Sequence, residues 1–284
     1  MGGAPFVTRF APSPTGLLHR GHAFSALTAF AAAQETGGRF LLRIEDIDAG
    51  RCRPEFETAI KDDLTWLGLT WEEPVLRQSE RLGAYGAALE DLRARGLLYR
   101  CFRTRKATLD DIGRAPHCVA DRLTPGPLPS DEEARLLAEE RPFAWRLSLA
   151  AAERAVGGFS TLNFREEGAG SEGQHGAIAA RPALSGDVIL ARKDLGVSYH
   201  LAVVVDDAWQ GVTHVIRGCD LFAAAHTQRL LQALLDLPTP VYHHHPLLLR
   251  PDGKRFAKRD TAETLADLRA RGVTAAALRA ELRV

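Results

Sequence analysis

The chain has 284 residues, of which 45% are hydrophobic, and its 36 basic side chains are balanced by 36 acidic ones. This length suits one large or two ordinary globular domains with a sizeable core, and it argues against a disordered chain. The balanced charge gives no bulk argument for nucleic-acid binding, although local charge can still be uneven.

The first third of the chain predicts a strand, a helix and a second strand. Residues 6–10 are typical of a short strand, residues 21–34 of a helix that ends at Gly37-Gly38, and residues 39–44 of another strand. Because these elements follow one another within about 40 residues, they imply a parallel sheet with a right-handed crossover. Residues 55–67 and 81–95 are typical of helices.

The middle of the chain differs in composition and predicts an inserted domain. Residues 124–130 are loop-like, residues 131–140 predict a charged helix capped by Ser130, and residues 166–176 are rich in glycine. The continuous apolar run at 201–205 then suits a central strand covered on both faces, so we expect the parallel sheet to resume there.

Targeting and membrane signals are not evident. The N-terminus lacks a basic region followed by an apolar core, and the four cysteines are scattered, so we expect a cytoplasmic protein without a disulfide framework. The apolar run at 23–33 is shorter than the roughly 20 residues that cross a bilayer, and no membrane partner is expected.

Two short stretches far apart in the chain predict a nucleotide site. Residues 9–22 combine a Pro- and Gly-shaped turn, two imidazoles at His19 and His22, and a helix N-terminus that can face a phosphate. Residues 255–259 follow the flexible Gly253 and carry clustered cations able to reach a triphosphate. Together they indicate ATP binding.

The first stretch resembles the "HIGH" signature region of class I aminoacyl-tRNA synthetases, in the form found in glutamyl enzymes. Residues 42–48, 198–207, 214–218 and the stretch after Gly253 resemble further blocks of glutamyl catalytic domains, in the same order. The resemblance spans essentially the whole chain. It implies an α/β fold with a class I Rossmann-like parallel sheet, an inserted α+β domain and a short helical C-terminal tail.

The resemblance also implies domain boundaries. Residues 1–97 and 198–250 are expected to form the two halves of the catalytic domain. Residues 98–197 are expected to form the inserted, acceptor-binding-like domain, and residues 251–284 the "KMSKS"-type loop and the helical tail.

Activation of an amino acid joins its carboxylate to the α-phosphate of ATP, so donors must meet the charge that develops on the phosphoryl oxygens. By resemblance, His19 and His22 bind phosphate oxygens, Gly21 leaves room for adenosine, and Lys258 closes over the triphosphate; ATP and Mg2+ are the implied cofactors. The loop is altered, since Arg255 and Ala257 stand where lysine and serine are usual. Arginine keeps the charge but changes the geometry.

A glutamate pocket needs cations for the carboxylate and an anion for the ammonium. The family pattern assigns Arg9 and Arg217 to the carboxylate, Glu45 to the ammonium, and Tyr199 to a hydroxyl contact. Bidentate recognition by arginine disfavours glutamine, whose amide cannot accept two such bonds. The polar edge beside these side chains is assigned to Phe10, Ala11, Pro12 and Ser13.

Relatives can carry a zinc site in the insertion, but here the pattern is broken. Arg103 and Arg114 replace two of the four ligands, which leaves Cys101 and Cys118 with His117 nearby. Because structural zinc takes four ligands, we expect no metal there. The triplet at 243–245 sits where a strand edge is expected, which favours packing near the site over a metal centre.

The acceptor is inferred from resemblance alone. The chain ends 25 residues after Arg259, and it resembles the short glutamyl paralogues that activate L-glutamate without tRNA and transfer it to queuosine in the anticodon of tRNA(Asp). Basic residues at 93–106 and 250–284 would then contact phosphates, although solvated helix faces explain them as well. We expect a monomer.

Other interpretations remain open at this stage. A truncated glutamyl-tRNA synthetase would charge a tRNA 3′ end, and a non-catalytic RNA-binding paralogue is compatible with the altered loop. A generic nucleotidyltransferase is disfavoured because it would not need the glutamate-binding set.

Overall fold

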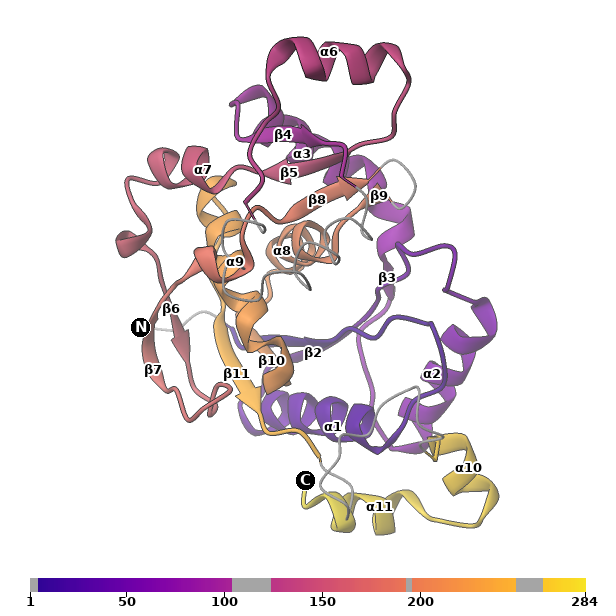
Figure 1. Ribbon diagram of the computed structural model, residues 1–284. Coiled ribbons are helices and arrows are strands. Elements are labelled where there is room, and N and C mark those ends of the chain that lie inside the picture. Colours follow the sequence, from indigo (N-terminus) through magenta and orange to yellow (C-terminus); the bar gives the residue numbers. More distant parts are fainter. Residues whose placement is uncertain (1–4, 104–123, 193–195, 249–262) are drawn as a thin grey trace.

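The computed structural model describes residues 5–103, 124–192, 196–248 and 263–284, and Figure 1 shows their arrangement. The strands are β1 (Val7–Phe10), β2 (Arg39–Ile44), β3 (Leu76–Arg77), β4 (Leu98–Cys101), β5 (Ala144–Leu147), β6 (Asn163–Glu166), β7 (Gly176–Ala179), β8 (Ile189–Arg192), β9 (Gly196–Val197), β10 (His214–Gly218) and β11 (Val241–His245). The helices are α1 (Arg20–Glu35), α2 (Pro54–Trp66), α3 (Leu82–Ala94), α6 (Ser130–Ala138), α7 (Leu149–Ala155), α8 (Tyr199–Trp209), α9 (Phe222–Leu234), α10 (Leu265–Ala270) and α11 (Ala275–Leu282).

The N-terminal strand–helix–strand unit forms as predicted. β1 pairs in parallel with β2, with Val7 opposite Arg39, and β2 pairs in parallel with β3. Helix α1, between β1 and β2, ends at Glu35, and Gly37 follows its cap with a φ of 62°, which suits glycine. The next residue, Gly38, approaches the backbone so closely that a Cβ would lie 2.4 Å from the Phe6 carbonyl oxygen.

The sheet resumes at β10. The Thr213 amide donates to the Val7 carbonyl at 2.9 Å, and the Val7 amide donates to Thr213 Oγ1 at 2.9 Å, so β10 lies beside β1. From β10 the order continues through β11 and β6 to β7, and both β10–β11 and β11–β6 are parallel pairs. The carboxyl ends of β1, β2 and β10 therefore meet along one edge.

Two local predictions were wrong. The apolar run at 201–205 is not a strand, because it forms the centre of α8, which begins where the Ser198 hydroxyl accepts from the Leu201 amide. In a run this short and apolar, periodicity does not distinguish a helix from a strand. The N-cap at Ser198 was the signal that the prediction did not use. The second error is at Ser130, which is the first helical residue of α6 rather than its cap, while Pro129 occupies the cap position without a side-chain hydrogen bond.

A separate four-stranded sheet, β4–β5–β8–β9, lies within the region expected to be inserted. Its neighbouring strands are all antiparallel, and in Figure 1 it lies above α8 together with α6. β6 and β7 come from the same region of the chain but join the sheet of β10 and β11. The exact domain boundaries stay a prediction.

Alternate side chains of β2 supply two cores on opposite faces of the sheet. Phe40, Leu42 and Ile44 pack in the layer of α1, whereas Leu41 packs in the layer of α8 and α9. In Figure 1, α1 lies below β2, and α8 and α9 lie above it. The tail helices α10 and α11 bury four leucines in the α1 layer, each stabilising by about 1.5–3 kcal/mol on full burial. Within the described ranges, no helix combines the length and apolarity needed to cross a bilayer.

Candidate active site

A cavity of about 660 Å³ opens at the carboxyl-terminal edge of the parallel strands, which is where ligands bind in open α/β sheets. It brings together all eleven of the predicted site residues that the structure describes. Lys258 lies outside the described residues. The eleven that line the cavity are Arg9, Phe10, Ala11, Pro12, Ser13, His19, Gly21, His22, Glu45, Tyr199 and Arg217.

The two imidazoles of the signature are fixed by the start of α1. His19 is the N-cap, and its Nδ1 accepts from the Gly21 amide at 3.1 Å; His22 Nδ1 accepts from the His19 amide at 3.2 Å. Because each Nδ1 accepts, the proton of each neutral ring must lie on Nε2. An Nε2–H is the kind of donor group that a phosphoryl oxygen requires.

The structure gives a second reason for glycine at position 21, besides the predicted need for space for adenosine. A Cβ at this position would lie 3.0 Å from His19 Cε1 and 3.2 Å from its Nδ1. A side chain would thus crowd the capping imidazole as well as the cavity that Gly21 lines.

A buried charge network holds Arg9 and Glu45. Asp207, from α8, accepts from Arg9 Nε at 2.9 Å and from Arg43 Nη1 at 2.7 Å. Arg43 is completely buried, and its Nη2 donates to Glu45 Oε1 at 3.2 Å while its Nη1 also reaches Gln210. One carboxylate thus sets the positions of two guanidinium groups, and one of these in turn orients Glu45.

Burial and charge act against each other in this network. Burial alone would raise the pKa of the Asp207 carboxyl, but Arg9 and Arg43 lower it below its usual value. For Glu45 burial dominates, and the pKa is raised although Arg43 and Arg9 oppose the shift. An ammonium group bound beside Glu45 would oppose this rise and favour the charged carboxylate.

Arg217, from β10, is held by three hydrogen bonds. Its Nε donates to His244 Nε2 at 3.0 Å, its Nη2 to the Leu221 carbonyl at 3.1 Å, and its Nη1 to the Tyr199 hydroxyl at 3.4 Å. These bonds use three of its five N–H groups. Among the described residues, one N–H on each terminal nitrogen thus remains for a carboxylate ligand.

The tautomer of His244 follows from its partners. Because its Nε2 accepts from Arg217, its Nδ1 must carry the proton, which it donates to Glu166 Oε2 at 2.6 Å. Burial, together with the charge of Arg217, lowers the pKa of His244. Burial alone would raise the pKa of Glu166, but the hydrogen bonds from His244 lower it. The predicted role of the histidine triplet, packing near the site, agrees with this geometry.

The backbone ties the signature loop to its surroundings. The Glu45 amide donates to the Pro12 carbonyl at 3.0 Å, and the Arg53 amide donates to the Pro14 carbonyl at 3.0 Å. The loop that follows β1 is thereby fastened to the segment that follows β2. This connection brings Glu45 to the same cavity as Ser13.

The tail docks on the signature helix. Leu265 donates its amide to the Leu18 carbonyl at 2.8 Å, and Thr264 forms a β-bridge with His19. Arg20, at the variable position of the signature, pairs with Glu263 at 2.6 Å and with Glu281 at 3.0 Å. The residues that follow the cation-rich stretch 255–259 are thus anchored to the signature helix, beside the cavity.

The zinc prediction concerns a region that is only partly described. Cys101 is a buried free thiol at the end of β4, whereas Arg114, His117 and Cys118 lie outside the described residues, so the zinc expectation stays a prediction. In the described part of the chain, no three His, Cys, Asp or Glu side chains cluster as a metal site would need.

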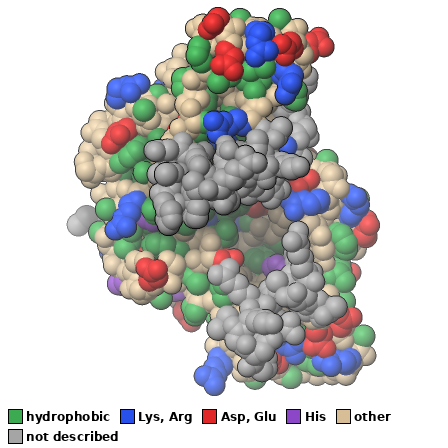
Figure 2. Space-filling view, in the orientation of Figure 1, with side chains coloured by type: hydrophobic (Ala, Val, Ile, Leu, Met, Phe, Trp, Pro, Cys, Tyr) green, Lys and Arg blue, Asp and Glu red, His purple; other side chains and the backbone are tan. Residues whose placement is uncertain are grey.

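In the described part of the basic stretch, residues 93–103, three arginines already form ion pairs within the protein. Arg93 and Arg95 pair with Glu90 and Asp91, and Arg100 pairs with Glu133. Figure 2 shows acidic and basic side chains interspersed around α6 rather than separated by sign.

Comparison with known proteins places these features in a family. The family model "tRNA synthetases class I (E and Q), catalytic domain" matches residues 5–123 and 162–284. The chain therefore belongs to the class I tRNA synthetases of the glutamate and glutamine type.

Individual relatives show which members of the family the chain is similar to. The Glutamyl-Q tRNA(Asp) synthetase of Rhodobacter capsulatus is 47% identical over 96% of this chain and 98% of its own length, and that of Symbiobacterium thermophilum is 44% identical over 94% and 82%. Glutamate--tRNA ligase 2 of Dinoroseobacter shibae is 41% identical over 96% of this chain but 59% of its own length. The crystal structure of a glutamate tRNA ligase from Elizabethkingia meningosepticum in complex with its amino acid matches with a TM-score of 0.72, at 28% identity, over 90% of this chain and 52% of that chain. The chain thus spans about half of that solved structure.

Proposed function

We propose that the protein activates L-glutamate with ATP in the absence of tRNA and transfers the glutamyl group to the queuosine base of tRNA(Asp). The observation that carries the proposal is the single cavity that gathers the two signature imidazoles with Arg9, Glu45 and Arg217. The higher identity to relatives named Glutamyl-Q tRNA(Asp) synthetase supports queuosine as the acceptor.

In the first step, a carboxylate oxygen of glutamate forms a bond to the α-phosphorus of ATP, and the bond to pyrophosphate breaks. His19 and His22 would donate through Nε2 to phosphoryl oxygens, where negative charge develops in the transition state. Mg2+ would arrive on the phosphate oxygens of ATP, since it usually binds substrate phosphates and retains several waters. Lys258 is proposed to add a cation to the triphosphate.

Glutamate would be held by charge complementarity. Its side-chain carboxylate would meet Arg217 and Arg9, its ammonium group would meet Glu45, and Tyr199 would add a hydroxyl contact. Backbone groups from Phe10 to Ser13 would line the polar edge. In the second step, a hydroxyl oxygen of the acceptor bonds to the activated carbonyl carbon, AMP leaves, and the hydroxyl proton is released.

Transfer of labelled glutamate to tRNA(Asp) with and without queuosine tests this proposal. We expect label on the modified tRNA alone, at the base. Label at the 3′ end of either tRNA would instead support a truncated glutamyl-tRNA synthetase, the alternative favoured by the 41% identity to a glutamate--tRNA ligase. No label on any tRNA, and no activation, would support the non-catalytic alternative.

A further inference from the structure

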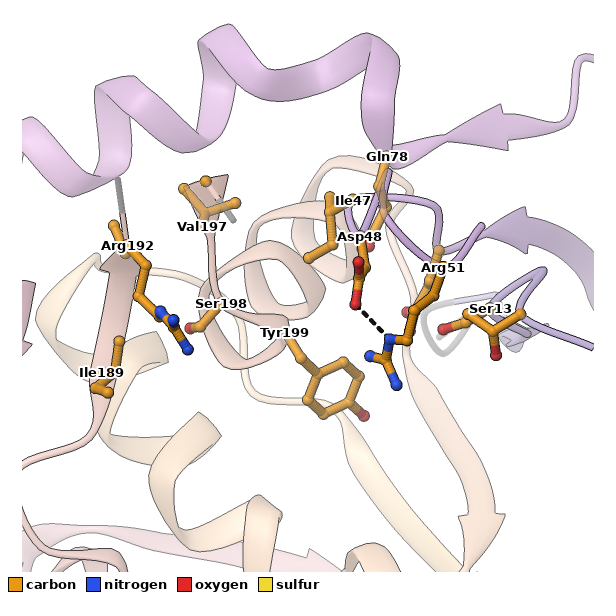
Figure 3. A pocket seen from close by; sticks show the side chains of 14 residues that line it. Ser13, Ile47, Asp48, Arg51, Gln78, Ile189, Arg192, Val197, Ser198 and Tyr199 are labelled. Carbon is orange, nitrogen blue, oxygen red and sulfur yellow. Dashed lines mark hydrogen bonds and ion pairs between the residues drawn. The ribbon is translucent and has the colours of Figure 1, made fainter. Parts of the chain in front are cut away.

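A second, smaller cavity of about 310 Å³ adjoins the glutamate cavity. Figure 3 shows Ile189 and Arg192 of β8 on one side of it and Ile47, Asp48 and Arg51 from the segment after β2 on the other. This volume is at the lower end of the roughly 300–1,000 Å³ typical of small-molecule sites, so it suits one ring system. The residues that line both cavities are Ser13, Thr15, Glu45, Arg51 and Tyr199.

One fully buried side chain in this second cavity has an oriented and unused hydrogen-bond acceptor. Gln78 Nε2 donates to Asp206 Oδ2 at 3.0 Å, and Asp206 also accepts from Arg81 Nε and the Tyr85 hydroxyl, both at 2.7 Å. Because a carboxylate only accepts, the amide nitrogen must face Asp206 and the amide oxygen must face away. Across the described residues, Gln78 Oε1 has no hydrogen-bond partner.

An unsatisfied buried acceptor costs about 1–3 kcal/mol, so its presence calls for a donor that the described residues do not supply. Gln78 lines the second cavity, and a ligand or water there can supply the missing N–H or O–H. The Asp206 cluster fixes the amide in advance, and this reduces the ordering that binding would require.

The rest of the lining indicates the kind of ligand. Ile47, Ile189 and Val197 provide apolar walls against which a ring can pack, and the Asp48 carboxylate, paired with Arg51 at 2.6 Å, adds a second acceptor. The ligand that suits this cavity is therefore a ring that is apolar on its faces and carries hydroxyl or amino donors at its edge.

We propose that this cavity is the subsite for the acceptor nucleoside and that Gln78 Oε1 accepts a hydrogen bond from a hydroxyl or amino group of its ring. This inference rests on the proposed function, because it identifies where the second substrate of that reaction binds. The attacking hydroxyl must reach the carbonyl carbon of the activated glutamate. A subsite that shares Ser13, Glu45 and Tyr199 with the glutamate cavity provides that proximity.

Two variants test the subsite independently. Gln78→Met removes the amide at similar volume, and Ile189→Trp fills the cavity from β8 without changing the Asp206 cluster. The control is Leu184→Trp, at a residue that is 57% exposed and does not line either cavity. For each protein, glutamate-dependent pyrophosphate exchange without tRNA and transfer to queuosine-containing tRNA(Asp) are measured.

We expect the ratio of transfer kcat/KM to exchange kcat/KM to fall roughly tenfold in both variants, through a raised KM for tRNA, and to stay at the wild-type value in the control. If the ratio in Ile189→Trp equals the wild-type ratio, the subsite is overturned while the proposed function stays intact. This holds also where transfer kcat/KM and exchange kcat/KM fall by the same factor. A wild-type protein that shows no exchange, or no transfer to the modified tRNA, overturns the proposed function and the subsite with it.

Discussion

Replacing His244 tests whether Arg217 owes its position to the imidazole behind it. In His244→Phe, Arg217 Nε loses its acceptor, and Glu166 Oε2 loses its imidazole donor. Glu166 Oε1 keeps two backbone donors, the amides of Gly168 and residue 244, each at 2.8 Å. The fold should therefore survive, while the guanidinium is no longer fixed.

The magnitude follows from the hydrogen bonds involved. A hydrogen bond to a charged group contributes about 1.5–3 kcal/mol, so a displaced Arg217 should raise the KM for glutamate roughly 10- to 100-fold. His244→Gln can supply one acceptor and one donor, and we expect it to restore most of the loss. His243→Phe is the matched control, because alternate residues of β11 point to opposite faces of the sheet.

The assay is glutamate-dependent pyrophosphate exchange as a function of glutamate concentration and pH. Protonated His244 cannot accept from Arg217, so the wild-type KM should rise as the pH falls through the lowered pKa of His244, which lies below 6.5. This acid-side rise should be absent in His244→Gln. An unchanged KM in His244→Phe, or the same acid-side rise in His244→Gln, would refute the reasoning.

Three further predictions concern the surrounding framework. Arg43→Met leaves Asp207 and Glu45 with one cation fewer in a buried network, so the free energy of unfolding should fall by about 3–5 kcal/mol, and an unchanged urea midpoint would contradict this. Arg20→Ala removes two partly exposed ion pairs to the tail, so the loss should stay below about 2 kcal/mol; a larger loss in the same titration would mean that the tail depends on this residue far more than its exposure suggests. Burial, with the charge of Arg217, lowers the pKa of His200 from 6.5 to about 4, so its contribution to stability is complete above pH 6.5 and is lost as the pH falls toward 4. That loss is at most about 3 kcal/mol, and His200→Gln should remove it from the pH profile; parallel profiles for the two proteins would show the attribution to be wrong.

The elements with strong local signals were predictable from the sequence. The first β–α–β unit has two short apolar runs, a Pro-rich turn, an Ala-rich run and a Gly37-Gly38 stop, and the structure confirms it. α8 was mistaken for a strand because its Val-rich run is buried on most sides, and burial hides the helical period. Its cap, Ser198, and the two aspartates that follow the run were the signals that could have corrected the prediction.

The groups that touch the cavity were easier to predict than those behind them. Signature residues such as His19 and Arg9 were predicted from the resemblance of the local sequence to a known family, and the structure gathers them at one cavity. Asp207, Glu166 and Gln78 act through partners that are 78 or more residues away in the chain or through tertiary burial, which spacing does not encode. A general signal did exist, since a charged residue inside a buried run, such as Arg43 in β2, requires a partner.

The measurement that tests the central claim most directly is ATP–pyrophosphate exchange by the purified protein with no tRNA present. If one cavity binds ATP and selects a carboxylate side chain through Arg9 and Arg217, L-glutamate should support exchange, and L-glutamine should not. Exchange that requires tRNA, exchange supported equally by L-glutamine, or no exchange with L-glutamate would contradict the account.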